Sequence, residues 1–194
     1  MHTKGEIFMY TLFIDTHDKN VVIILYKNNN ILDLNIENSN YGHSQITLPR
    51  IKQMLDKYNL KPQDLNTIAV VIGPGSFTGI RIGVTIAKTL AYTLNIPIKI
   101  IDSLKLKAIS YKTNEDFLIS MEDKNGAYIG KFNKDYEQLE EYKYLSKKDY
   151  ESIKNQVTNV EPNYQELISY INKSESINPH KVNPIYIKRI GVEK

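Results

Sequence analysis

The sequence predicts an α/β protein with a mixed five-stranded sheet, helices on the faces of that sheet, and a smaller, shortened second α/β lobe. Two observations support this fold class. Three apolar, β-branched runs precede the first helical pattern, and helical and strand patterns then alternate. Strands joined by short turns pair antiparallel, whereas strands joined through a helix lie parallel and their connections cover the sheet. The expected arrangement is therefore ribonuclease-H-like.

The first three expected strands are residues 10–16, 21–27 and 31–36, which are separated by turn-forming residues. A helix is expected over residues 42–59, because Leu48, Ile51, Leu55 and Tyr58 recur at helical spacing. Pro49 lies inside this pattern and should kink the helix or mark its true start.

The next expected strand, residues 67–72, is apolar at its centre, as in strands buried on both faces. It leads through a glycine-rich segment into a second helix over residues 79–94. Residues 98–101 form the fifth expected strand. Asp102 or Ser103 should cap a third helix that extends through Tyr111. This order supplies the five strands of one sheet.

Beyond Asn114 the pattern is weaker and predicts a second lobe. Ser146 and Asp149 resemble a capping box, and Pro162 suits the first turn of a helix that ends near Lys173. The expected strands of this lobe are residues 117–121, 127–132 and 139–145. We therefore expect a first lobe at residues 9–111 and a second at 112–194, with residues 1–8 a tag or upstream extension.

Composition excludes several classes of site. The chain of 194 residues has no cysteine, so disulfides, thiolate metal sites and a cysteine nucleophile are impossible. No apolar run reaches the length of a membrane span, and residues 1–8 lack the apolar stretch of a secretory signal, so a cytoplasmic location is expected. The net charge of +3 is spread along the chain and gives only weak support for a polyanionic partner.

The glycine-rich segment is the most informative part of the sequence. A strand, a glycine turn and a helix form a generic anion site. No lysine follows the glycines, which excludes a Walker A loop, and Thr78 stands where a dinucleotide fingerprint has its third glycine. A purely structural interpretation is also open, in which Pro74 stiffens the turn, Ser76 or Thr78 caps the helix, and Phe77 packs nearby. The segment reads Gly73, Pro74, Gly75, Ser76, Phe77, Thr78, Gly79, Ile80, Arg81, Ile82, Gly83.

This string resembles the signature of the TsaB (YeaZ) family of tRNA threonylcarbamoyladenosine biosynthesis proteins. The resemblance includes residues 13–16, 43–45, 48–49 and 101–104, and it covers the chain from about Tyr10 to Ala108. The second lobe departs from the family, since residues 122–126 read Glu-Asp-Lys-Asn-Gly where the family has Asp-Ala-Arg before a glycine. Residues 183–187 resemble its Pro-x-Tyr-Leu ending. The resemblance implies an actin-like (ASKHA) fold.

Active members of that superfold hold a nucleotide between their lobes with glycine-containing loops. Here the first loop would follow Asp15, and residues 15–20 contain no glycine, so Asp15 marks a degenerate phosphate-loop position. The four histidines are too scattered for the paired histidines of a metal helix, and His43 is expected to anchor its own helix. We expect no catalytic residue, no metal and no cofactor. Arg81 could reach a partner carboxylate or a tRNA backbone, or be solvated or internally paired.

The apolar face of the helix at residues 79–94 predicts an interface. The resemblance implies that the first two helices pair with the catalytic protein TsaD and allow self-association when the chain is alone. Complete burial of the face by the second lobe is the alternative. The expected interface residues are Ile80, Ala87, Leu90, Ala91 and Leu94, widened by Ile82 and Ile86, together with Leu48, Ile51 and Leu55.

The resemblance thus implies a non-catalytic subunit for the N6-threonylcarbamoyladenosine (t6A) modification beside the tRNA anticodon. TsaD would carry the metal and the chemistry, TsaE would be the ATPase of the assembly, and tRNA would be contacted indirectly. The alternatives are an independent phosphotransferase or peptidase of the same superfold, and a homodimeric interaction module.

Overall fold

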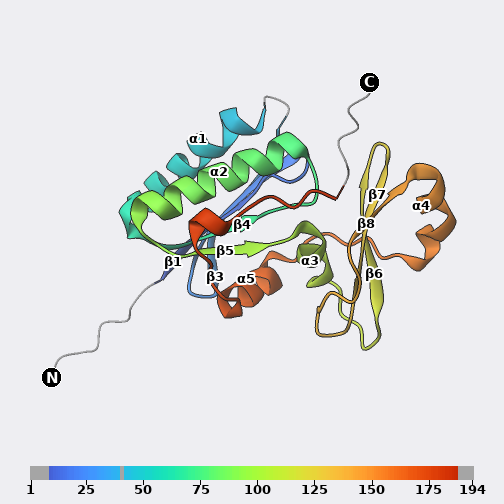
Figure 1. Cartoon of the computed structure of the whole chain (residues 1–194). Helices are drawn as coiled ribbons and strands as arrows, with labels where there is room; N and C mark the ends of the chain where they lie inside the picture. The colour runs from blue at the N-terminus through green and yellow to red at the C-terminus, as the bar shows by residue number, and fades with distance from the viewer. Residues whose placement is uncertain (1–8, 40–41, 188–194) are drawn as a thin grey trace.

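The computed structural model describes residues 9–39 and 42–187, so the expected tag at residues 1–8 lies outside the described residues. The larger sheet has five strands in the order β3-β2-β1-β4-β5 (Figure 1). β1 pairs antiparallel with β2 and parallel with β4, which confirms the ribonuclease-H-like arrangement. The strands are β1 (Tyr10–Asp15), β2 (Asn20–Lys27), β3 (Asn30–Asn38), β4 (Leu65–Val71) and β5 (Ile98–Ile101).

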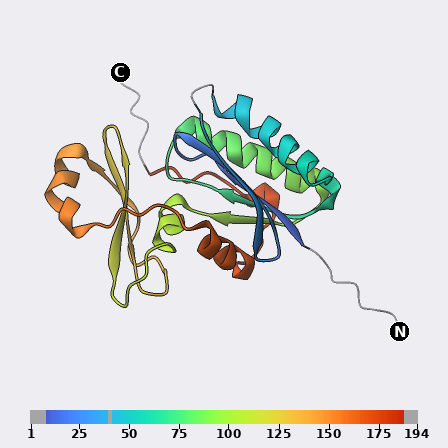
Figure 2. The same cartoon turned by 180° about the vertical axis from the view of Figure 1, so that it is seen from behind.

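Helices cover both faces of this sheet. The long helices α1 (His43–Lys57) and α2 (Phe77–Leu94) lie on one face, and the 3-10 turn η1 (Pro62–Asp64) follows α1. The shorter α3 (Ser103–Ala108) and α5 (Tyr164–Lys173) lie on the other, as both views show (Figures 1 and 2). Each face has its own buried apolar cluster. The alternating apolar residues of the buried strands supply both clusters.

Two local expectations are corrected at the helix starts. α1 begins at His43 and runs through Pro49, so the proline does not mark the start of the helix. α2 begins at Phe77, two residues earlier than expected, and Ser76 caps it by accepting a hydrogen bond from the Gly79 N–H at 3.2 Å.

The second sheet is antiparallel, in the order β6-β7-β8. Its strands are β6 (Phe117–Asp123), β7 (Gly126–Phe132) and β8 (Lys143–Ser146). The last strand is shorter than the expected residues 139–145. α4 (Lys147–Ile153) follows it, capped by Ser146 as predicted, and the 3-10 turn η2 (Lys154–Gln156) comes next.

The chain then returns to the first sheet. Leu167, Ile168 and Ile171 of α5 are buried in the cluster on the face opposite α1 and α2, together with residues of β1, β2, β4 and β5. The final segment includes η3 (Pro179–Lys181) and places Val182 in the cluster under α2. The expected lobe boundary after Tyr111 lies where the chain leaves the first sheet. Residues 164–187, beyond that boundary, pack on the first sheet again. Within the described residues, no helix has the length and hydrophobicity that a membrane crossing requires.

Candidate functional site: the β1 to α2 junction and the surface of α2

The turn after β1 is closed by a buried contact between a carboxylate and an imidazole. The Asp15 carboxylate accepts the His17 backbone N–H at 3.0 Å and contacts the His17 Nδ1 at 2.6 Å, and both side chains are buried. Burial alone would lower the pKa of the His17 imidazole, but the Asp15 carboxylate raises it above its ordinary value, with Asp18 adding to the effect. At the predicted degenerate phosphate-loop position, the carboxylate is thus engaged by a neighbouring imidazole.

This turn lies directly on the start of α2. The Thr16 Oγ1 donates to the Gly79 carbonyl at 2.7 Å, and the Ser76 N–H donates to the His17 carbonyl at 2.7 Å. A Cβ at Gly79 would lie 2.1 Å from the Thr16 carbonyl oxygen, and a Cβ at Gly83 would lie 2.3 Å from the Thr16 Oγ1. These two glycines of the motif therefore permit the close approach of a helix to a strand turn.

His43 joins the same junction from α1. Its Nε2 lies 2.7 Å from the Asp18 carbonyl oxygen, so the side chain fixes the start of α1 to the turn after β1, in the anchoring role predicted. A hollow of about 220 Å³ opens beside it and is also bordered by Glu122 and Asp123 at the end of β6. Across residues 9–39 and 42–187, no group of three histidine or acidic side chains is placed to hold a metal ion.

Arg81 is internally stacked. Its guanidinium carbon lies 3.6 Å from the centre of the Phe77 ring, and its Nε donates to the Tyr186 hydroxyl at 2.8 Å. The Phe77 and Tyr186 rings are 5.0 Å apart at their centres. Sequence reasoning did not place Tyr186 here, because the residues are 105 positions apart. The only sequence signal was the resemblance of residues 183–187 to the family's ending.

The rest of the motif lies in the tight turn before α2. Gly73 adopts a φ of 101°, a value that side-chain-bearing residues rarely adopt. The Gly73 and Pro74 carbonyls accept hydrogen bonds from the backbone N–H and the hydroxyl of Ser103, which ties the turn to the start of α3. Thr78 is exposed in the first turn of α2. The motif thus joins β1, α1, α2 and α3 at one end of the sheet.

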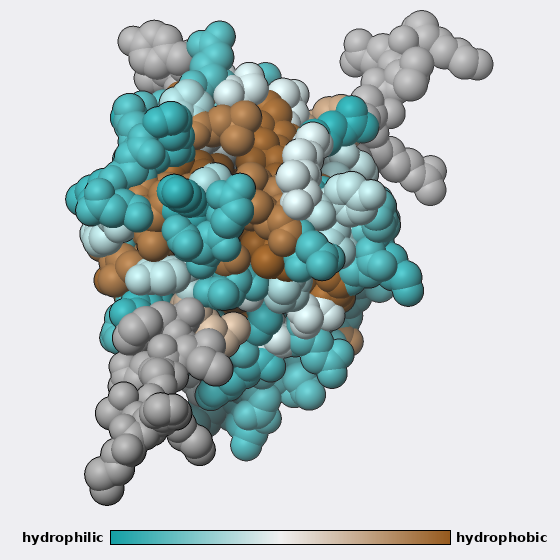
Figure 3. Space-filling model, turned by 90° about the vertical axis from the view of Figure 1, so that its left-hand side faces the viewer, coloured by the Kyte–Doolittle hydropathy of each residue, from teal (hydrophilic) through white to brown (hydrophobic). Residues whose placement is uncertain are grey.

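The predicted interface residues divide into two groups. Five are buried in the chain's own core and cannot contact a partner, which revises the prediction for Ile80, Ala87, Ala91, Ile51 and Leu55. Leu48 is 52% exposed, and Leu90 and Leu94 are half-buried. Figure 3 shows apolar surface on the upper half of one face, where α1 and α2 lie, with hydrophilic residues around it.

Ile82, Ile86 and Leu90 recur every four residues and lie on one side of α2, and all three are half-buried. We call these residues together with Leu48 the apolar stripe. The sequence could not distinguish the residues of the apolar stripe from the buried residues of the same helices, since both sets are apolar at helical spacing.

Comparisons with known proteins agree with this geometry. The family model described as "TsaD: tRNA N6-adenosine threonylcarbamoyltransferase" matches residues 37–166. The Bacillus subtilis tRNA threonylcarbamoyladenosine biosynthesis protein TsaB is 41% identical over 100 residues, which cover 52% of this chain and 44% of that protein. The match therefore spans less than half of that relative's length.

Two further comparisons cover nearly the whole chain. The uncharacterized protein MG208 of Mycoplasma genitalium is 30% identical over 92% of this chain and 95% of its own length. The solved structure of YeaZ from Pseudomonas aeruginosa matches with a TM-score of 0.74 at 18% identity, covering 92% of this chain and 99% of that one, and so shows the same fold. From the motif, the fold and these matches, the chain belongs to the TsaB (YeaZ) family, among the proteins that the TsaD model describes.

Proposed function

We propose that this chain takes part in t6A biosynthesis on tRNA as a non-catalytic subunit that pairs with TsaD. The curated relatives named TsaB are described as tRNA threonylcarbamoyladenosine biosynthesis proteins. The observation that carries the pairing is the apolar stripe on the outer surface of α1 and α2. In this assembly TsaD performs the chemistry, TsaE supplies the ATPase, and the chain stabilises TsaD in the cytoplasm.

The stripe has the properties of a protein interface. Leu48 is the most exposed apolar side chain of α1, and Ile82, Ile86 and Leu90 of the neighbouring α2 are only partly covered. Contiguous apolar surface with a polar rim is typical of sites where another protein packs. Fully burying one leucine contributes about 1.5–3 kcal/mol, so four partly exposed apolar residues can anchor a helix pair. The same stripe would serve self-association when TsaD is absent.

The junction at Asp15 supports the non-catalytic part of the proposal. In this fold a nucleotide phosphate would approach the turn after β1 and the first amides of α2. Here the Asp15 carboxylate is held by His17, the Ser76 N–H is held by the His17 carbonyl, and the Gly79 N–H is held by Ser76. A phosphate would have to displace these contacts, each worth about 1 kcal/mol or more.

The test is capture of the same organism's TsaD by the purified chain. Leu48→Asp should weaken capture about tenfold or more, because a carboxylate would be desolvated at the interface. The matched control is Leu139→Asp, since Leu139 is 43% exposed on the second lobe, comparable to Leu48 at 52%. Ala87 is unsuitable for a charge because it is fully buried. Equal capture by wild type and Leu48→Asp would refute the proposed interface, and failure of the wild type to support t6A formation in a reconstituted reaction would refute the function.

A further inference from the structure

A second surface runs along α2, on the side away from the apolar stripe. Phe77, Arg81, Lys88 and Tyr92 follow one another at intervals of four, seven and four residues, which places them on one face of the helix. Ile82, Ile86 and Leu90 occupy a different face. α2 therefore presents two chemically distinct outer surfaces, one apolar and one that carries cations and aromatic rings.

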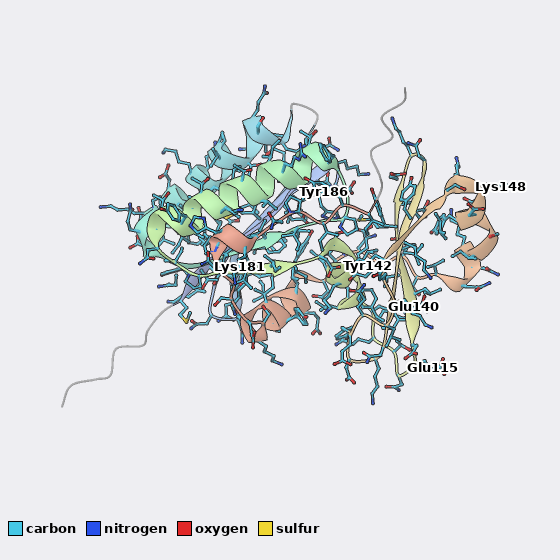
Figure 4. All side chains as sticks on the ribbon, in the orientation of Figure 1. Glu115, Glu140, Tyr142, Lys148, Lys181 and Tyr186 are labelled. Atoms are coloured by element: carbon cyan, nitrogen blue, oxygen red, sulfur yellow. The ribbon has the colours of Figure 1, made fainter. Side chains whose placement is uncertain are left out.

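The final segment of the chain adds to the second surface. It runs alongside α2 in the opposite direction: His180 packs edge-on against Tyr92 at 5.0 Å between centres, the Lys88 Nζ donates to the Val182 carbonyl at 2.8 Å, and Tyr186 meets Arg81. Figure 4 shows Lys181 and Tyr186 at different points along this segment beside α2. We call Phe77, Arg81, Lys88, Tyr92, His180, Lys181 and Tyr186 the α2 strip.

The charge of the α2 strip has one sign. Neither α2 nor residues 176–187 contain an aspartate or glutamate. Arg81 is exposed, and within the described residues its side chain makes one hydrogen bond, from Nε to Tyr186, which leaves the two terminal nitrogens available. A guanidinium held flat on a ring presents its outer edge to a bidentate anion. The strip is thus built to receive negative charge.

Both tyrosines of the strip are open to solvent. Tyr92 is 66% exposed and Tyr186 is 46% exposed, values uncommon for tyrosines that serve only packing. A hollow of about 390 Å³ lies beside Tyr92 and His180, and it is also lined by Asn95 and Asn178, whose Oδ1 accepts the His180 N–H. Its volume is within the range of small-molecule sites, and amide groups beside an aromatic ring suit the edge and face of a nucleobase.

We infer that the α2 strip binds single-stranded RNA, with Arg81 on a backbone phosphate and Tyr92 and His180 against a base. Arg81 and Tyr92 are eleven positions apart in one helix, which separates them by about 16 Å, at 1.5 Å per residue. Interleaved cations and exposed rings are typical of single-strand binding, in which bases stack on the rings. The carboxylates of a partner protein would pair with the cations only and would not explain the exposed rings. The inference deepens the proposed function by giving this subunit a direct contact with RNA.

The test is fluorescence anisotropy with the full chain and a fluorescein-labelled RNA hairpin that has an unpaired loop. Arg81→Gln and Tyr92→Leu should each weaken binding about tenfold. Arg81→Lys should also lose affinity while keeping the dependence on salt, because the charge stays and the stacked plane is lost. The matched control for charge is Lys148→Gln, at an exposed lysine of α4 on the second lobe (Figure 4), which should bind as the wild type does.

Three outcomes would overturn the inference. The first two are no binding of the hairpin by the wild type and equal binding by Arg81→Gln and the wild type. The third is Arg81-dependent binding of a labelled oligoglutamate peptide that is stronger than binding of the hairpin, which would assign the strip to an acidic protein. Circular dichroism establishes that each variant is folded. Because Arg81 and Tyr92 lie off the apolar stripe, their variants should capture TsaD normally. Failure of RNA binding with normal TsaD capture would therefore remove this inference and leave the proposed function standing.

Discussion

Alanine at Gly83 should destabilise the protein, and removing one hydroxyl should reverse the effect. The added Cβ would lie 2.3 Å from the Thr16 Oγ1 but 3.5 Å from the Thr16 Cβ, so the clash is with the hydroxyl. Overpacking of this kind costs about 1–3 kcal/mol, and alanine in a helix interior gains about 1 kcal/mol over glycine. Gly83→Ala alone should therefore lower the free energy of unfolding by up to about 2 kcal/mol.

Thr16→Ala should remove that cost. On its own it loses the hydrogen bond from Oγ1 to the Gly79 carbonyl, worth about 1 kcal/mol. In the Thr16→Ala background the clash at Gly83 is gone and only the helix preference remains, so Gly83→Ala should be neutral or stabilising by up to about 1 kcal/mol. The two substitutions should show a coupling energy of about 1–3 kcal/mol in a double-mutant cycle.

Gly79→Ala is the control that distinguishes side chain from backbone. Its Cβ would lie 2.1 Å from the Thr16 carbonyl oxygen, which Thr16→Ala retains. The loss on Gly79→Ala should thus be the same in both backgrounds. Urea unfolding followed by circular dichroism measures all of these free energies. The reasoning is refuted if Thr16→Ala rescues both glycine variants equally, or rescues neither.

Two further predictions concern hydrogen-bonded carboxylates. The pKa of His17 is raised beside Asp15, so the stability from this pair is fully present below roughly pH 6.5 and is lost as pH rises through the raised folded-state pKa. Thermal unfolding should show this loss in the wild type and a flatter dependence on pH in His17→Gln. Identical pH profiles would contradict a stabilising role for the pair. The Tyr142 hydroxyl, from the segment before β8, donates at 2.8 Å to the Asp102 carboxylate that caps α3. Tyr142→Phe should cost about 1.5–3 kcal/mol in urea unfolding, because a half-buried carboxylate loses a donor, whereas Tyr92→Phe, at an exposed ring, should cost less than about 0.5 kcal/mol.

The order of strands and helices followed from the sequence, because the periods that distinguish them are local. The turn residues after β1 and β2 predicted an antiparallel start, and the helices α1 and α2 predicted the parallel strands β4 and β5. Ser146 was identified as a cap for the same reason, and Ser76 was one of two candidates with Thr78, since a cap is recognised within a few residues of its helix. The family motif was likewise contained in one uninterrupted segment.

Tertiary contacts decided the rest. The apolar positions of α2 form a wide arc, and which of them are fully buried depends on elements far away in the chain. Ala87 is fully buried in the core, whereas the neighbouring Ile86 packs at its edge and stays partly exposed. The return of α5 to the first sheet, and the meeting of Arg81 with Tyr186, join residues that no local pattern connects. The burial of a side chain depends on what packs against it. The sequence therefore determines which faces of a helix are apolar or charged, whereas the fold determines which of those faces stays exposed to a partner.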